Sequence, residues 1–148
     1  MDASARLNSH KYLLLAGVGE AEDNVLRLVV KEARPGQTQR LKVEGTILGE
    51  AREIKAEEGV PGYEVVFEHY VAYAVTNESY DLRDDDAQYE GRLFRTYTKS
   101  RFLDYVRRST IASDDYPGPY VHYGVICLNH IIDVASVEVP RIRRLEGI

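Results

Sequence analysis

Four residues near the C-terminus carry the kinds of side chain from which enzymes assemble activated nucleophiles and acid–base pairs. They are His122, Cys127, His130 and Asp133. A carboxylate beside an imidazole raises its basicity, and an imidazole beside a thiol can activate that thiol as a nucleophile. The segment that contains them, YPGPYVHYGVICLNHIIDVASVEVP, holds two apolar runs. We interpret these runs as antiparallel strands joined by a two-residue turn at Asn129-His130, with Leu128 opposite Ile131.

That register decides which of these groups can act together. Because side chains alternate along a strand, His122 and Asp133 share one face, whereas Cys127 lies on the other face among valines. A cysteine in such a place is expected to be a packed, inert thiol. Along the strands His122 and Asp133 stand about four residues apart, roughly 13 Å at ~3.3 Å per residue, so each needs a different partner.

The second candidate histidine, His69, belongs to the clearest strand pattern of the chain. The turn Gly59-Val60-Pro61-Gly62 precedes YEVVFEHYVAYAVTNESY, in which alternate residues from Tyr63 to Val75 are apolar or aromatic. His69 falls on this apolar face, where a histidine is more often a hydrogen-bonded core residue than a base. One hypothesis is therefore a small hydrolase or isomerase that uses His69, or His122, with a carboxylate such as Asp133.

Eleven tyrosines and no tryptophan are the unusual feature of the composition. Five of the tyrosines lie in the most apolar strands, namely Tyr63, Tyr70, Tyr73, Tyr120 and Tyr123. A tyrosine offers a large rigid contact with one polar tip, which suits a core with hydroxyls at its rim and equally a pocket or interface. Because no coherent catalytic constellation is present, our leading interpretation is a non-enzymatic binding or protein-interaction module. Its partner would be a protein or a small molecule that contacts these tyrosines.

A basic segment between residues 92 and 108 suggests a third function. Its candidate anion-binding or nucleic-acid-binding residues are Arg92, Arg95, Arg101 and Arg108. Such residues can hold phosphates, and the interleaved Tyr97 and Tyr105 could stack on bases. On a short amphipathic helix, however, basic residues also occupy the solvent face and the last turn. The net charge of −5 argues against indiscriminate binding to nucleic acid.

Two short stretches look like nucleotide and calcium sites but lack the residues those sites need. In GVGEAED, Gly17 and Gly19 are followed by Glu22 where a dinucleotide fingerprint has its third glycine, so we predict a turn between strands. The stretch DLRDDD at 81–86 lacks the central glycine of a calcium loop, which predicts a solvated loop. We expect no metal and no cofactor.

The elements that must position these residues are mainly strands. The run VLRLVV should end near Ala33, a further strand with a bend at Gly45 should begin near Gln39, and YEGRLFRTY should form another. A helix is an open alternative for 50–58. The stretch TKSRFLDYVRRST changes to a helical period, which predicts one short helix capped by Ser100.

Seven or eight strands and one short helix, without strand–helix alternation, predict a mainly β (α+β) fold. We expect a curled or barrel-like antiparallel sheet. A chain of 148 residues fits a single domain spanning 1–148. The long apolar run GVICLNHIIDVASV must be central or covered, and at an edge it would pair with a second copy, so a homodimer is a further expectation.

Composition also bears on location. The apolar run YLLLAGV has only seven residues, too few for a signal peptide or a membrane span, so we expect no membrane association. The single cysteine permits no internal disulfide, which favours a reducing compartment such as the cytoplasm.

The phrases FEHYVAYAVTNESY and HYGVICLNHIIDVAS together are similar to small bacterial proteins of a family without an assigned activity. The similarity covers roughly the C-terminal two thirds of the chain. It implies no catalytic or binding residue, so the hypotheses above rest on the residues alone.

Overall fold

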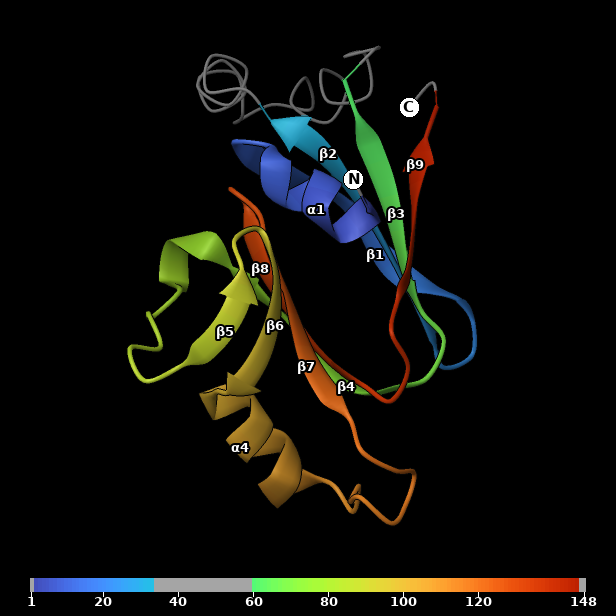
Figure 1. Ribbon diagram of the computed structural model, residues 1–148, viewed down its shortest axis with the longest axis vertical. Helices are drawn as coiled ribbons and strands as arrows, with labels where there is room; N and C mark the ends of the chain where they lie inside the picture. The colour runs from blue at the N-terminus through green and yellow to red at the C-terminus, as the bar shows by residue number, and fades with distance from the viewer. Residues whose placement is uncertain (1, 34–59, 147–148) are drawn as a thin grey trace.

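The fold consists of two antiparallel sheets that face each other. It is seen in a computed structural model that describes residues 2–33 and 60–146. The first sheet has the order β1 (Tyr12–Glu22), β2 (Val25–Ala33), β3 (Gly62–Phe67), β9 (Arg141–Leu145). The second has the order β4 (Tyr70–Asn77), β8 (His130–Ser136), β7 (Val121–Ile126), β6 (Phe94–Lys99), β5 (Gln88–Gly91). Figure 1 shows the first sheet on the right and the second on the left.

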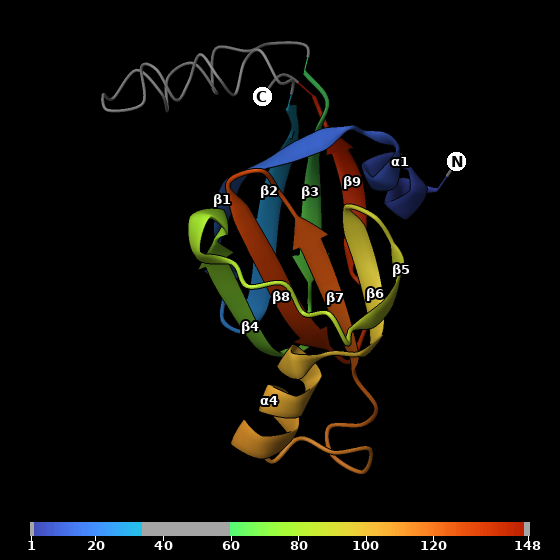
Figure 2. The ribbon, with the colours of Figure 1, turned by 90° about the vertical axis from the view of Figure 1, so that its left-hand side faces the viewer.

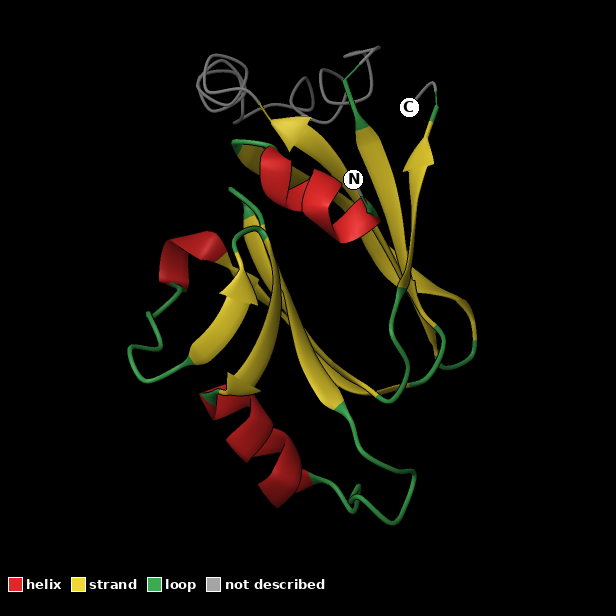
Figure 3. Cartoon of the chain, viewed as in Figure 1, coloured by secondary structure: helices red, strands yellow, loops and turns green. Residues whose placement is uncertain are grey.

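The core lies between the sheets, where the central strands of each sheet place apolar side chains. Leu28 of β2 and Val65 of β3 are fully buried, as are Val125 of β7 and Val134 of β8. Helix α1 (Ala3–Ser9) lies across one end of the two sheets, and its Leu7 completes the same core (Figure 3). This packing of sheet on sheet accounts for the alternating pattern of the sequence.

The mainly β, antiparallel prediction is confirmed, but its finer form is wrong. The described residues form nine strands in two sheets, where the sequence suggested seven or eight strands in one curled or barrel-like sheet. YEGRLFRTY is a hairpin, β5 and β6, that turns at Arg92-Leu93. Helix α1 was missed, and α4 (Arg101–Ser109) has the predicted Ser100 as its N-cap.

The long strand predicted from Tyr63 to Val75 is two strands in different sheets. The chain leaves β3 at Phe67, crosses at Glu68-His69, and enters β4 at Tyr70. His69 is exposed in this link and does not lie on an apolar core face, so that prediction is wrong. Its backbone carbonyl accepts hydrogen bonds from the Val137 amide and the Ser136 hydroxyl.

The turn predicted at GVGEAED lies further along the chain. β1 runs through Gly17 and Gly19 to Glu22, and the hairpin to β2 turns at Asp23-Asn24, where Asn24 has φ of 66°. Asparagine tolerates this left-handed conformation better than most residues. The hairpin itself is as predicted, and β2 ends at Ala33. The strand and helix expected between Gln39 and Glu58 lie outside the described residues.

The register of β7 and β8 matters most for the site. Ile126 pairs with Ile131, and the Cys127 amide donates to the His130 carbonyl, so the turn is Leu128-Asn129. The predicted pairing of Leu128 with Ile131 is therefore wrong by two residues. An even shift leaves every side chain on its predicted face. Tyr123, Val125, Ile132 and Val134 face the core, as expected.

Candidate functional site

The candidate site is a cavity of about 540 Å³ on the outer face of the second sheet. β6, β7 and β8 form its floor, and the loop 81–87, which connects the short 3₁₀ helix η1 (Glu78–Tyr80) to β5, runs along one side. The first residues of α4 close one end. Figure 2 shows this loop crossing in front of β8 and β7. The loop is therefore a wall of the cavity, although the sequence indicated only a solvated acidic loop.

A chain of three hydrogen-bonded polar side chains, two buried and one half-buried, lies at the floor of the cavity. His122 Nε2 is 2.7 Å from Asp133 Oδ1, and His122 Nδ1 is 2.8 Å from Ser100 Oγ. The distance of roughly 13 Å expected between His122 and Asp133 is wrong, because the two-residue register shift makes them diagonal neighbours on β7 and β8. The histidine is 1% exposed and Ser100 is 4% exposed.

The direction of these hydrogen bonds follows from the groups available. A carboxylate only accepts, so His122 Nε2–H donates to Asp133. Ser100 Oγ accepts the Leu103 amide at 3.0 Å as the cap of α4, and its hydroxyl proton is left to donate to Nδ1. Both imidazole nitrogens are thus occupied by protein partners. The ring has no free nitrogen to offer a substrate in this arrangement.

Aromatic rings hold the imidazole in place. Tyr97 stacks on His122 with centroids 4.1 Å apart and planes 10° apart, and Phe102 of α4 contacts it at 4.9 Å. Gly124 makes room for this stack, because a Cβ there would lie 2.8 Å from Tyr97 Cε1. Burial raises the pKa of Tyr97, so its hydroxyl keeps its proton at neutral pH.

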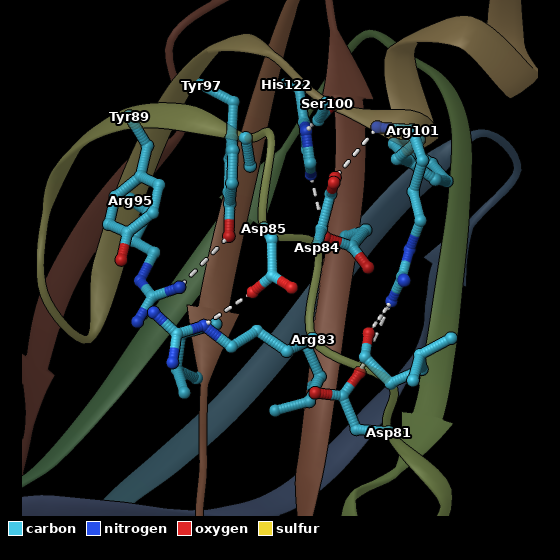
Figure 4. A pocket seen from close by; sticks show the side chains of 16 residues that line it. Asp81, Arg83, Asp84, Asp85, Tyr89, Arg95, Tyr97, Ser100, Arg101 and His122 are labelled. Atoms are coloured by element: carbon cyan, nitrogen blue, oxygen red, sulfur yellow. Dashed lines mark hydrogen bonds and ion pairs between the residues drawn. The ribbon is translucent and has the colours of Figure 1, made fainter.

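The Arg95 guanidinium is held in the cavity by an aromatic ring and two hydrogen bonds. Its guanidinium lies over the Tyr89 ring, 4.2 Å from the centroid, and donates to the Tyr97 hydroxyl at 3.3 Å (Figure 4). Its Nε donates to the Arg92 carbonyl at 2.8 Å. The Tyr89 ring and these hydrogen bonds hold the Arg95 guanidinium in one position.

The other charges in the cavity have partners. Arg83 pairs with Asp85 at 3.1 Å, and Arg101 lies 3.7 Å from Asp81 and donates to the Leu82 carbonyl. The aspartate beside them, Asp84, accepts the Arg101 backbone amide at 2.9 Å, at the start of α4. Asp133 has His122. Among the arginines of the described residues that line this cavity, Arg95 is the one without a carboxylate partner.

The structure brings together only part of the predicted basic segment. Arg95 and Arg101 line the cavity, whereas Arg92 donates to backbone carbonyls of the N-terminal segment, Asn8, His10 and Lys11. Arg108 is exposed on α4 and does not line the cavity. The four arginines therefore do not form one continuous anion-binding row.

The five candidate tyrosines lie in separate places. Tyr63 contacts His10 Nε2 at 2.5 Å beside α1, and Tyr123 is buried in the core against Phe94. Tyr70 and Tyr73 form an edge-to-face pair on β4, and Tyr120 packs near α4. Burial and a hydrogen bond to Glu20 raise the pKa of Tyr70 to about 12. Partner binding through these tyrosines stays a prediction.

The tyrosines that line the cavity, Tyr89 and Tyr97, were not among the site residues predicted from the sequence. Tyr89 was not considered, and Tyr97 was noted only as interleaved with basic residues. Ser100 was recognised as a helix cap, which is half of its role. A pattern of period two places Tyr97 and Arg95 on one face of β6, and this signal could have paired them.

Other expectations can be checked in the described part of the chain. Cys127 is 3% exposed, and burial raises the pKa of its thiol to about 12, so it is the packed cysteine expected. No three His, Cys, Asp or Glu side chains of residues 2–33 and 60–146 are grouped to hold a metal ion. No helix in these ranges is long and apolar enough to cross a membrane.

Fold and site together define a two-sheet antiparallel protein with a polar cavity on the outer face of one sheet. No family model, curated protein or solved structure matches the chain. Its function must therefore be argued from the cavity itself.

Proposed function

We propose that the protein is a non-enzymatic binding module, and that the cavity beneath loop 81–87 takes a small ligand with one anionic group. The observation that supports this is the state of Arg95, a guanidinium fixed on Tyr89 and Tyr97 with no carboxylate partner in the described residues. An arginine presents paired donors that match a carboxylate or phosphate. The partner that Arg95 lacks is therefore an anion.

Preorganisation of Arg95 favours binding over a merely structural role. A free arginine loses side-chain freedom when it binds, and that loss weakens affinity. Here Nε and Nη1 are already held by the Arg92 carbonyl and the Tyr97 hydroxyl, and no carboxylate of the described residues is paired with the guanidinium. The ligand therefore meets a donor group that is already ordered.

The test is a ¹H–¹⁵N NMR titration with acetate and with inorganic phosphate at low ionic strength. We expect saturable shifts of amides around Tyr89, Arg95 and Tyr97 in the native protein. Arg95→Gln should lose these shifts, whereas Arg108→Gln, which changes an exposed arginine outside the cavity, should keep them. Equal binding by Arg95→Gln, or no saturable shifts in the native protein, would overturn the proposal.

One observation supports a second candidate, a serine hydrolase. The order Ser100, His122, Asp133 is that of groups which activate a serine nucleophile. Against it, Ser100 Oγ is committed to the Leu103 amide and is buried, and the hydroxyl serves as a helix cap. A fluorophosphonate probe should therefore leave Ser100 unlabelled. A mass adduct on the peptide that contains Ser100 would favour the hydrolase instead.

A further inference from the structure

A second cavity adjoins the first at the end of the sheet where β7 and β8 are joined. It measures about 500 Å³ and shares Asp81, Ile126 and Ile131 with the first. Beyond these shared residues its walls include Leu13 of β1 and Leu128 of the β7–β8 turn. The two cavities are therefore neighbouring parts of one elongated site, with a polar part around Arg95 and a more apolar part beyond.

The strand register sets the order of groups along this site. Arg95 pairs with Gly124, and Gly124 with Asp133, so these three residues form one row across β6, β7 and β8. Ile126 pairs with Ile131 in the next row on the same face. Two residues of strand separate the rows, about 7 Å at ~3.3 Å per residue. A group that extends from an anion on Arg95 along the strand direction thus reaches the row of the isoleucine pair.

The second cavity offers an anion no preorganised cation comparable to Arg95. Its two acidic residues, Glu78 and Asp81, are matched by Lys11 and Arg92. Its Arg92 is engaged by backbone carbonyls, and Lys11 lies 5.7 Å from the centre of the Tyr12 ring. We therefore place the anion at Arg95, and a group that extends from it into the second cavity meets apolar side chains such as Leu13 and Leu128.

We infer that the ligand is an amphipathic monocarboxylate with a straight hydrocarbon chain. Its carboxylate pairs with Arg95, and its chain passes over Ile126 and Ile131 toward Leu128. This inference rests on the proposed function, because it needs the anion site at Arg95. It adds the class of ligand and the direction in which the ligand lies.

Chain length is the quantity that tests it. Each methylene removed from water strengthens binding about fourfold where its burial is complete. We expect affinity to rise in the series acetate, butyrate, hexanoate, octanoate, measured by NMR titration with every acid below its micelle concentration. Octanedioate should bind more weakly than octanoate, because its second carboxylate would lose water among apolar side chains such as Leu13 and Leu128.

Substitutions in the two cavities test the carboxylate and the hydrocarbon chain of the ligand separately. Ile131→Ser, or Leu128→Ser should the first fail to fold, is expected to flatten the rise with chain length and leave acetate binding unchanged. Arg95→Gln should weaken all four acids by a similar factor. Ile111→Ser is the matched control, because Ile111 is exposed and lines neither cavity.

The outcomes distinguish this inference from the proposal on which it rests. Acetate binding that needs Arg95 but does not strengthen with chain length would overturn the inference and leave the anion site intact. Failure of both acetate and octanoate to bind would overturn both. A rise with chain length that persists in Ile131→Ser and Leu128→Ser would place the chain elsewhere and overturn the inference.

Discussion

His122 and Asp133 are joined by a hydrogen bond of 2.7 Å although they come from different strands and are not directly opposite each other. His122 pairs with Ala135 across the ladder, and Asp133 pairs with Gly124. The bond therefore runs diagonally, from one row of the sheet to the next. It supplies the partner that a fully buried imidazole N–H requires.

Removing the Asp133 carboxylate should destabilise the fold. Asp133→Ala leaves His122 Nε2–H buried without an acceptor, a loss of about 1–3 kcal/mol in the free energy of unfolding. Asp133→Asn keeps an oxygen that can accept and should cost less. Urea unfolding measures both. Asp85→Ala is the control, since that carboxylate is exposed and paired with an exposed arginine, and it should change stability by less than about 0.5 kcal/mol.

Ser100→Ala should cost more than the loss of an ordinary helix cap. A cap alone is worth about 1 kcal/mol, and here the same hydroxyl is also the partner of buried His122 Nδ1. Ser100→Thr keeps the hydroxyl and should lose less. Thr98→Ala removes a nearby exposed hydroxyl for comparison. A cost for Ser100→Ala no larger than a cap, measured by urea unfolding, would contradict a role for Ser100 beyond capping.

The faces of β7 and β8 could be predicted from the sequence, but their register could not. Alternation along β7 assigns His122 and Val125 to opposite faces whatever the pairing, and a register error of an even number of residues also leaves the faces of β8 correctly assigned. The pairing depends on the turn at Leu128-Asn129. The Asn129 amide accepts from the Leu15 backbone N–H and donates to the Leu15 carbonyl, so a residue far away in sequence holds the turn. No local pattern carries that contact.

The site was only partly predictable for the same reason. Arg95, Arg101, His122 and Asp133 were singled out by residue type, yet what unites them is loop 81–87. That loop lies over the sheet because Asp84 and Arg101, seventeen residues apart, are hydrogen-bonded. His69 was misplaced because an alternating pattern does not reveal that the chain passes from one sheet to the other.

Gly124 should not tolerate a methyl group. In Gly124→Ala the new Cβ would lie 2.8 Å from Tyr97 Cε1, so the tyrosine ring must shift from its stack on His122. Overpacking of this kind costs about 1–3 kcal/mol. Gly17→Ala is the matched control, because no atom lies within 4 Å of a Cβ there. Urea unfolding should show a loss for the first variant and no loss for the second.

Glu64 should stabilise the folded state at pH values above the ordinary pKa of a glutamate, and this contribution should be lost in acid. Hydrogen bonds from Arg143, at 2.8 Å, and from Arg27 hold the pKa of Glu64 below its usual value of 4.5. A carboxyl with a lowered pKa in the folded state stabilises it above the unfolded pKa. This contribution is lost as the pH falls through the lowered pKa that Glu64 has in the folded state. Glu64→Gln should therefore lose less stability between about pH 6 and pH 3 than the native protein.

Urea unfolding at several pH values measures this difference, and Glu90→Gln is the control. Glu90 is exposed on β5, and its replacement should leave the pH dependence unchanged. Parallel pH profiles for the native protein and Glu64→Gln would show that the two arginines do not act on this carboxyl.

Loop 81–87 should open more often once its contact with α4 is removed. Asp84 accepts the Arg101 amide at 2.9 Å, and the Arg101 side chain donates to Leu82 in the same loop. Asp84→Ala removes the first of these contacts. A partly exposed bond of this kind is worth about 1 kcal/mol, which corresponds to about a fivefold larger population of the open loop.

Limited proteolysis with trypsin reports on that opening, because Arg83 lies in the middle of the loop and its side chain is 90% exposed. Cleavage after Arg83, followed by mass spectrometry, should be several times faster in Asp84→Ala than in the native protein, as long as the loop opens and closes faster than trypsin cuts. Asp86→Ala removes an exposed carboxylate of the same loop and should leave the rate unchanged. Should Asp84→Ala be cleaved at the native rate, the hydrogen bond from the Arg101 amide to Asp84 is not what holds the loop over the cavity.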